Sequence, residues 1–155
     1  MTEKTVKVSD FLNDKLIFLN QKFKSTDELF EKVAEVAKNS QMVTESFLPK
    51  IKEREATFPT GLELEDRGVA IPHTDADTIK SEFVAVITNQ EGIPFKRMDD
   101  PNQNVSAKII FVLGLNQPHA QLEMLQALMG VIQDTSVLNQ IQNATSVDEI
   151  KELLK

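Results

Sequence analysis

The stretch AKIIFVLGL, residues 107–115, is short, nearly continuous in apolar residues and contains several β-branched side chains. The stretch FVAVIT, residues 83–88, has the same character. Strands of this kind are covered on both faces, because a strand with one solvated face would alternate apolar and polar residues. The two stretches therefore predict central strands of a sheet that has protein on both sides.

Further strands are predicted outward from this centre. GVAI (68–71) and LIFL (16–19) are short apolar runs that read as strands. Between the two central strands, EGIPFKRMDDPNQN (91–104) contains glycine, proline, asparagine and aspartate, and is predicted to be a turn-rich connection.

Helices are predicted before and after these strands. Residues 25–39 carry a capping box in Ser25 and Glu28, followed by apolar residues at helical spacing. A second helix is predicted after Thr44 and up to Glu55, with Pro49 in its first turn, where proline removes no helical hydrogen bond.

Two more helices follow the strand at 107–115. Asn116 is a candidate cap for the first, and Pro118 is expected in its first turn. Its apolar stripe is predicted to be core; the members are Leu122, Leu125, Leu128, Met129 and Ile132. The closing segment 146–155 repeats the capping pattern with Ser146 and Glu149. The predicted fold class is α/β, a single domain over residues 1–155 with a mixed β-sheet sandwiched between α-helices.

The composition restricts the function classes. A net charge of −7 argues against a nucleic-acid partner, since such proteins need basic surface to displace counterions from phosphate. The same charge suits either ordinary solubility or a partner with a basic docking face. The chain has no cysteine, residues 1–10 lack the apolar core of a signal peptide, and no apolar run is long enough for membrane insertion. We therefore expect a cytoplasmic protein.

Only two histidines are present, and both stand where a strand is predicted to end. His73 follows Pro72, which stiffens the backbone before the imidazole. His119 follows Pro118 in the first turn of a predicted helix, where free backbone amides favour an anion. If the two strand ends are neighbours, the imidazoles can face each other across a cleft. A neutral imidazole nitrogen is a competent nucleophile near neutral pH, so phosphoryl or proton transfer is the chemistry this pair offers.

Two other interpretations of these residues remain open. A histidine at a strand end is often an ordinary loop residue, and Arg54 and Arg67 can be a solvated helix-end charge and a turn residue. His73, Asp75 and Asp77 also form an H-x-D-x-D pattern whose ligand types suit a metal. A metal centre normally draws ligands from several segments, however, and only His119 stands out as a further nitrogen ligand. Capping or turn roles fit the two aspartates better.

Several motifs together resemble a known family. FPTGL (58–62), GVAIPHTD (68–75) and PHAQLEMLQALM (118–129) are similar to the IIA components of the bacterial phosphoenolpyruvate-dependent sugar phosphotransferase system (PTS), in its fructose and mannitol superfamily. Within that superfamily the galactitol-specific IIA proteins are the nearest match, supported by MDDP (98–101). The resemblance covers nearly the whole chain.

The resemblance implies a phosphotransferase that carries a phosphoryl group on a histidine and needs no metal or cofactor. His73 would accept the group from the carrier protein HPr and pass it to a cysteine of a cognate IIB protein. A membrane IIC transporter, which binds the sugar, would be an indirect partner. His119 would hydrogen-bond the phosphoryl oxygens, Arg54 matches the family's active-site arginine, and Thr60 matches a hydroxyl near the phosphoryl group.

This sequence departs from the family pattern in two places. More residues separate Arg54 from His73 than in mannitol-type members, so Arg54 or Arg67, or both, would contact the phosphoryl group. Thr74 stands where many members have a small residue, although galactitol-like members share PHT, and it is a further candidate for phosphoryl binding. The resemblance implies galactitol or a related sugar or polyol. The alternative is a regulatory phosphohistidine switch of the nitrogen-related IIA type, without sugar flux.

Overall fold

A computed structural model of the chain describes residues 7–65 and 67–155, and at residues 118–120 it describes the backbone alone. It contains five strands: β1 (Leu12–Gln21), β2 (Gly61–Glu63), β3 (Gly68–Ala70), β4 (Phe83–Lys96) and β5 (Asn104–Gly114). The α-helices are α1 (Thr26–Asn39), α2 (Phe47–Thr57), α3 (Pro118–Ile132), α4 (Thr135–Asn143) and α5 (Val147–Leu153). Two short 3-10 helices complete the structure, η1 (Val8–Phe11) and η2 (Ala76–Thr78).

The five strands form one mixed sheet in the order β1-β4-β5-β3-β2. β4 and β5 are antiparallel at the centre, β1 runs parallel to β4, and β3 runs parallel to β5. β2 pairs with β3 as a short antiparallel edge. The predicted mixed sheet is confirmed, with 83–88 and 107–115 in the two central strands.

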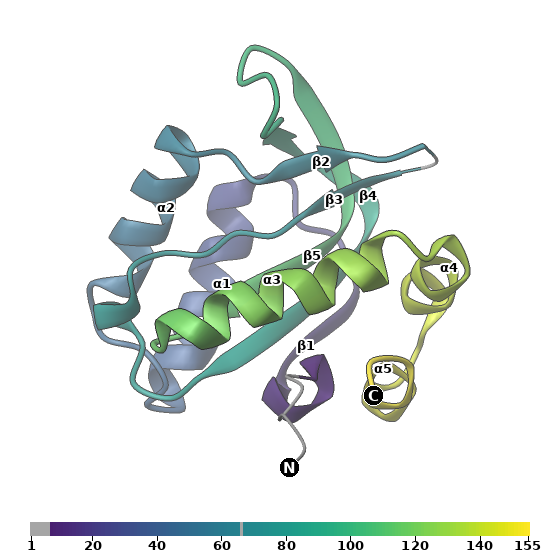
Figure 1. The fold of residues 1–155 in the computed structure, drawn as a ribbon. Coiled ribbons are helices and arrows are strands. Elements are labelled where there is room, and N and C mark those ends of the chain that lie inside the picture. Colours follow the sequence, from purple (N-terminus) through teal and green to yellow (C-terminus); the bar gives the residue numbers. More distant parts are fainter. Residues whose placement is uncertain (1–6, 66) are drawn as a thin grey trace.

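Each face of the sheet supports a separate hydrophobic core. One core joins the helices α1 and α2 to the face that carries Ala85, Ile87, Ile110 and Val112. The other joins α3, α4 and α5 to the face that carries Val84, Val86, Ile109 and Phe111. Successive residues of β4 and β5 thus point into opposite cores, which explains their continuous apolar sequence. Figure 1 shows α3 across the near face of the sheet and α1 behind it.

Most predicted helix starts are confirmed in atomic detail. The side chain of Ser25 accepts a hydrogen bond from the Glu28 amide, and the side chain of Ser146 accepts one from the Glu149 amide. Pro49 lies in the first turn of α2. Within the described residues, no helix has both the length and the apolar character needed to cross a membrane.

Three local expectations were wrong. The segment 91–104 is not all turn, because β4 continues to Lys96 after a register shift between Thr88 and Ile93. Asn116 does not cap α3: Gln117 holds that position, and the Asn116 side chain donates to the Ile79 carbonyl at 3.2 Å.

The third wrong expectation concerns the apolar stripe of α3. Leu128 and Ile132 are buried as expected, but Leu122 is 61% exposed and Met129 is 37% exposed. The buried side of α3 runs instead through Met124, which the stripe did not include. Elements β2 and α4 had not been predicted at all.

Candidate functional site

His73 lies just beyond the end of β3, beside the carboxyl end of β5. The Leu113 amide donates a hydrogen bond of 2.9 Å to the Pro72 carbonyl, and His73 pairs with Leu113 as an isolated parallel bridge. The strand pairing therefore continues past β3 up to the histidine. His73 itself is half-buried, so its ring is held by backbone structure but reaches the surface.

The ring of His73 is oriented by the chain that precedes it. Its Nδ1 atom lies 3.0 Å from the Ile71 carbonyl oxygen. A carbonyl oxygen can only accept, so Nδ1 carries the proton and donates it. In the neutral ring the proton-free nitrogen is then Nε2, whose lone pair is available to a reacting group.

The end of β5 leads directly into α3, whose first turn holds the second histidine. Because β3 and β5 are parallel neighbours, the two strand ends lie side by side, as the predicted pairing of the imidazoles requires. Figure 1 shows the start of α3 and the segment after β3 at the same end of the sheet. The side chain of His119 lies outside the described side chains, so its contact with a phosphoryl group stays a prediction.

Arg54 projects from the second half of α2 into a surface pocket that reaches the segment after His73. The pocket, of about 250 Å³, is lined by Arg54, Lys50, Thr74 and Asp75 among others. The Arg54 guanidinium lies over the Phe58 ring, 4.9 Å from its centroid. Its Nε atom is buried and has no hydrogen-bond partner in the described part of the chain. A buried donor without a partner is costly, so this arginine is suited to bind an incoming acceptor.

Thr74 and Arg54 therefore share one pocket, although they are far apart in sequence. Thr74 is 5% exposed and directly follows His73. Lys50 stands four residues before Arg54 on the same helix face, so two cations border the pocket. Two like charges four residues apart on a helix repel each other unless anions are near. The spacing of Lys50 and Arg54 is therefore a sequence signal for an anion at this position, and the prediction from the sequence missed it.

The anions next to Lys50 are the two aspartates after His73. Lys50 Nζ lies 3.6 Å from Asp75 Oδ2 and 3.4 Å from Asp77 Oδ2. Asp75 also begins the turn η2, since its carbonyl accepts from the Thr78 amide and hydroxyl. Within the described residues, no three His, Cys, Asp or Glu side chains are grouped so as to hold a metal ion.

Thr60, which the resemblance places near the phosphoryl group, is hydrogen-bonded to Glu55 in the structure, and its role in phosphoryl binding stays a prediction. It is 2% exposed, and its hydroxyl donates to Glu55 Oε1 at 2.7 Å while its amide donates to Glu55 Oε2 at 2.8 Å. Burial raises the pKa of Glu55 to about 7, although the two Thr60 hydrogen bonds act in the opposite direction. Glu55 stands next to Arg54 in the R-E-x…T-G pattern, but the sequence assigned it no role.

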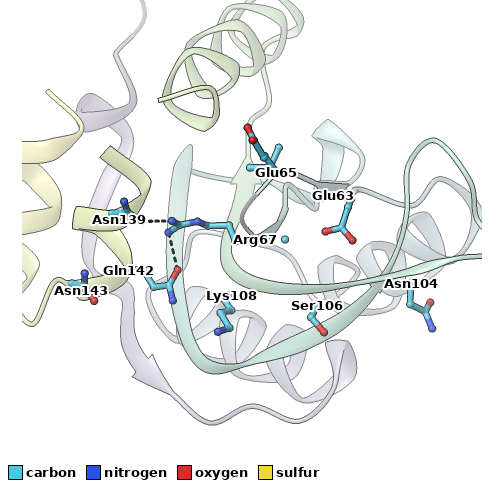
Figure 2. A pocket seen from close by; sticks show the side chains of 11 residues that line it. Glu63, Glu65, Arg67, Asn104, Ser106, Lys108, Asn139, Gln142 and Asn143 are labelled. Atoms are coloured by element: carbon cyan, nitrogen blue, oxygen red, sulfur yellow. Dashed lines mark hydrogen bonds between the residues drawn. The ribbon is translucent and has the colours of Figure 1, made fainter. Parts of the chain in front are cut away.

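Arg67 is not brought to His73. Its guanidinium donates to the side-chain oxygens of Gln142 and Asn139 on α4, as Figure 2 shows. It borders a cavity of about 780 Å³, which is also lined by Glu63 and Lys108. Arg67 precedes β3 and His73 follows it, so at about 3.3 Å per residue they are separated by up to roughly 20 Å. The structure thus groups Arg54 with Thr74, the residue after His73, and leaves Arg67 at the other end of the strand.

Comparison with known proteins gives a consistent result. The sequence model of the family described as "Phosphoenolpyruvate-dependent sugar phosphotransferase system, EIIA 2" matches residues 10–155. The galactitol-specific EIIA component of Escherichia coli K12 is 34% identical over 85 residues, covering 55% of this chain and 56% of that protein. The chain thus spans about half the length of the galactitol-specific relatives it matches.

Solved structures share the fold over nearly the whole chain. The nitrogen regulatory protein IIA-Ntr of Neisseria meningitidis has a TM-score of 0.79 at 24% identity, covering 96% of this chain and 99% of that one. Enzyme IIA for mannitol, in complex with phosphorylated enzyme IIB for mannitol from Escherichia coli, has a TM-score of 0.74 at 25% identity. That likeness covers 92% of this chain and 96% of the solved one.

Proposed function

This chain belongs to the EIIA 2 family of the phosphoenolpyruvate-dependent sugar phosphotransferase system, and from that membership we propose that it is a phosphohistidine carrier. His73 accepts a phosphoryl group from HPr, and the chain passes this group to a cognate IIB protein. The IIB protein in turn serves a membrane IIC transporter. We place this relay in the cytoplasm, as expected from the sequence.

The observation that carries the proposal is the hydrogen bond from His73 Nδ1 to the Ile71 carbonyl. The lone pair of Nε2 attacks phosphorus, and the bond between phosphorus and the donor breaks with its electron pair returning to the donor nitrogen. Nδ1 keeps its proton throughout and donates it to the Ile71 carbonyl oxygen. The phosphorylated ring is therefore cationic, and it leaves as neutral imidazole when the phosphoryl group moves to the IIB cysteine. A neutral leaving group suits a carrier that must release the group as readily as it accepts it.

The pocket next to His73 supplies the charge that phosphoryl transfer requires. In a loose transition state, charge spreads over three equatorial oxygens, and positioned cations and donors stabilise it. Arg54 offers a fixed guanidinium with a spare donor, and Thr74 offers a hydroxyl at the same pocket. His119 would complete the set from the first turn of α3. We assign no role in transfer to Thr60, whose hydroxyl is engaged by Glu55.

The substrate of the relay is proposed to be galactitol. The support is the 34% identity to galactitol-specific components, together with the MDDP and PHT motifs. Enzyme IIA for mannitol forms a complex with phosphorylated enzyme IIB for mannitol, and by analogy we expect a IIB partner here.

The proposal is tested by rebuilding the relay with purified proteins. Phosphoenolpyruvate, the general carrier enzymes and HPr are mixed with wild type or His73→Ala, and the intact mass of the chain is measured. One added phosphoryl group on wild type and none on His73→Ala is expected. Galactitol-type and mannitol-type IIB proteins are then offered as acceptors. Transfer to the galactitol-type IIB protein would support galactitol as the substrate of the relay. Phosphorylation of His73 without transfer to any IIB protein would favour the regulatory switch.

A further inference from the structure

The carboxylate of Glu55 ties the last turn of α2 to the edge of the sheet. Both of its oxygens accept from one residue, Thr60, through the amide at 2.8 Å and the hydroxyl at 2.7 Å. Thr60 in turn accepts a hydrogen bond of 3.4 Å from the Ile71 amide through its carbonyl oxygen. A short path of hydrogen bonds thus runs from Glu55 to the residue that orients the His73 ring.

The turn closed by this contact also carries the proposed phosphoryl-binding arginine. Arg54 is adjacent to Glu55 on α2, and its carbonyl accepts the Phe58 amide at 2.7 Å. The Phe58 ring, against which the Arg54 guanidinium packs, belongs to the same turn and is 60% exposed. Because the Phe58 ring is mostly exposed, it has few other contacts to hold it. The position of the turn after α2 therefore sets where the Arg54 guanidinium lies.

Charged groups from three elements surround Glu55. It lines a second pocket, about 270 Å³ in volume, together with Asp27 of α1, Lys52 of α2 and Lys96 of β4. Lys52 is already paired with Glu31 at 3.1 Å. Burial raises the pKa of Glu55 to about 7, so its carboxyl changes charge close to neutral pH.

We propose that Glu55 is a positioning residue for phosphoryl transfer: its ionised carboxylate holds the turn from α2 to β2 and thereby fixes Arg54 relative to His73. The inference rests on the proposed function. Glu55 touches neither the phosphoryl group nor the ring, so its effect passes through Arg54. When the carboxyl is protonated, one of its oxygens becomes a donor and the paired acceptance from Thr60 is lost.

The test compares wild type with Glu55→Gln, whose amide has nearly the shape of the protonated acid. The measured quantity is the initial rate of phosphoryl transfer from HPr between pH 5.5 and 8.5, expressed as the ratio of wild type to variant. Titration of HPr is common to both reactions and cancels in this ratio. We expect a ratio near one at low pH that rises on the order of tenfold above pH 7, since hydrogen bonds to a charged group are the stronger ones. A ratio that does not change with pH would overturn the proposal.

A double-mutant cycle separates positioning from a general structural effect. Glu55→Gln should slow transfer at pH 8.5 in the wild-type background but by less than about twofold in the Arg54→Ala background, because its effect passes through Arg54. An equal loss in both backgrounds would overturn the proposal. Glu45→Gln is the matched control, since its side chain is 86% exposed and precedes α2.

One readout does not depend on the relay. The backbone amide of Thr60 should shift in NMR spectra with a midpoint near pH 7 in wild type, and this transition should be absent in Glu55→Gln. If wild type accepts no phosphoryl group, the proposed function is wrong. In that case the pH dependence of the Thr60 amide signal alone decides whether Glu55 holds the turn. A Thr60 amide without that transition would overturn the Glu55 contact, whatever the relay does.

Discussion

The amide of Leu113 donates a hydrogen bond of 2.9 Å to the carbonyl of Pro72, and this contact fixes His73 beside the end of β5. The histidine is thus positioned by a deeply buried part of the sheet, not by a free loop. Thr74, the next residue of the chain, lines a pocket together with Arg54 of α2. The site therefore depends on how firmly the end of β5 is packed.

Gly114, the last residue of β5, tests that packing. A Cβ added there would lie 2.2 Å from Cε2 of Phe83, which is fully buried and packs edge-on against Phe47 with ring centroids 6.3 Å apart. Since neither ring has free space, Gly114→Ala should lower the free energy of unfolding by about 1–3 kcal/mol in urea denaturation. Gly130→Ala is the control, because a Cβ there meets nothing within 4 Å and alanine favours a helix. Equal stabilities of the two variants would contradict the packing described here.

The two arginines should differ in their effect on transfer. Arg54→Ala is expected to slow phosphoryl transfer from HPr by roughly 10- to 100-fold, the value of one or two charge-assisted hydrogen bonds. Arg67→Ala should leave the rate within about twofold, because that guanidinium is held by Asn139 and Gln142 of α4. Stopped-flow or quenched transfer assays with both variants check this. A large loss with Arg67→Ala alone would reverse the assignment.

The exposed residues of α3 should matter for a partner more than for folding. Leu122 is 61% exposed, so Leu122→Asp should change the free energy of unfolding by less than about 1 kcal/mol. Under the proposed function it should raise the apparent KM for a protein partner, since α3 also carries His119. Leu128→Ala on the same helix is the contrast: the side chain is fully buried, and its loss should cost about 2–5 kcal/mol. A Leu122→Asp variant with unchanged transfer to and from every partner would show that this face is not used.

Glu55 should make stability depend on pH in a defined direction. Burial raises the pKa of Glu55 from 4.5 to about 7, so between these values the folded state binds a proton that the unfolded state has lost. Stability therefore falls as pH rises through this window, on the order of 2–3 kcal/mol in all. Denaturation curves from pH 4 to 8 should show this decline for wild type relative to Glu55→Gln. At pH 8 the Glu55→Gln variant would then be more stable than wild type but slower in phosphoryl transfer. If the free energies of unfolding of the two proteins changed in parallel with pH, the burial of an ionised Glu55 would be contradicted.

The central strands and the helix starts were predictable because their signals are local. Continuous apolar residues in β4 and β5 reflect burial on both faces, and Ser25 and Ser146 cap helices within three residues of their partners. The extension of β4 through Lys96 was missed because Gly92 and Pro94 read as turn residues. Pro94 pairs with Ser106 of β5, a strand that follows later in the chain.

The candidate site was only partly predictable for the same reason. His73 could be placed at a strand end from the sequence, but its hydrogen bond to the Ile71 carbonyl depends on the side-chain rotamer and on the backbone after β3, for which the sequence has no local signal. The grouping of Arg54 with Thr74 depends on how α2 packs against the segment after β3, a contact between distant residues. Arg67 is close to His73 in sequence, but the extended β3 carries it to the opposite end.

The most direct test of the phosphocarrier function is to determine which atom of the chain carries the phosphoryl group. Wild type labelled with 15N in its histidine rings is phosphorylated through HPr, and phosphorus-nitrogen coupling is measured by NMR, with His73→Ala as the reference. We predict a single phosphoryl group on Nε2 of His73, with a proton retained on Nδ1. A phosphoryl group on Nδ1 of His73 would contradict the ring orientation described here. A His73→Ala variant that is phosphorylated as fully as wild type would contradict the phosphocarrier function of His73.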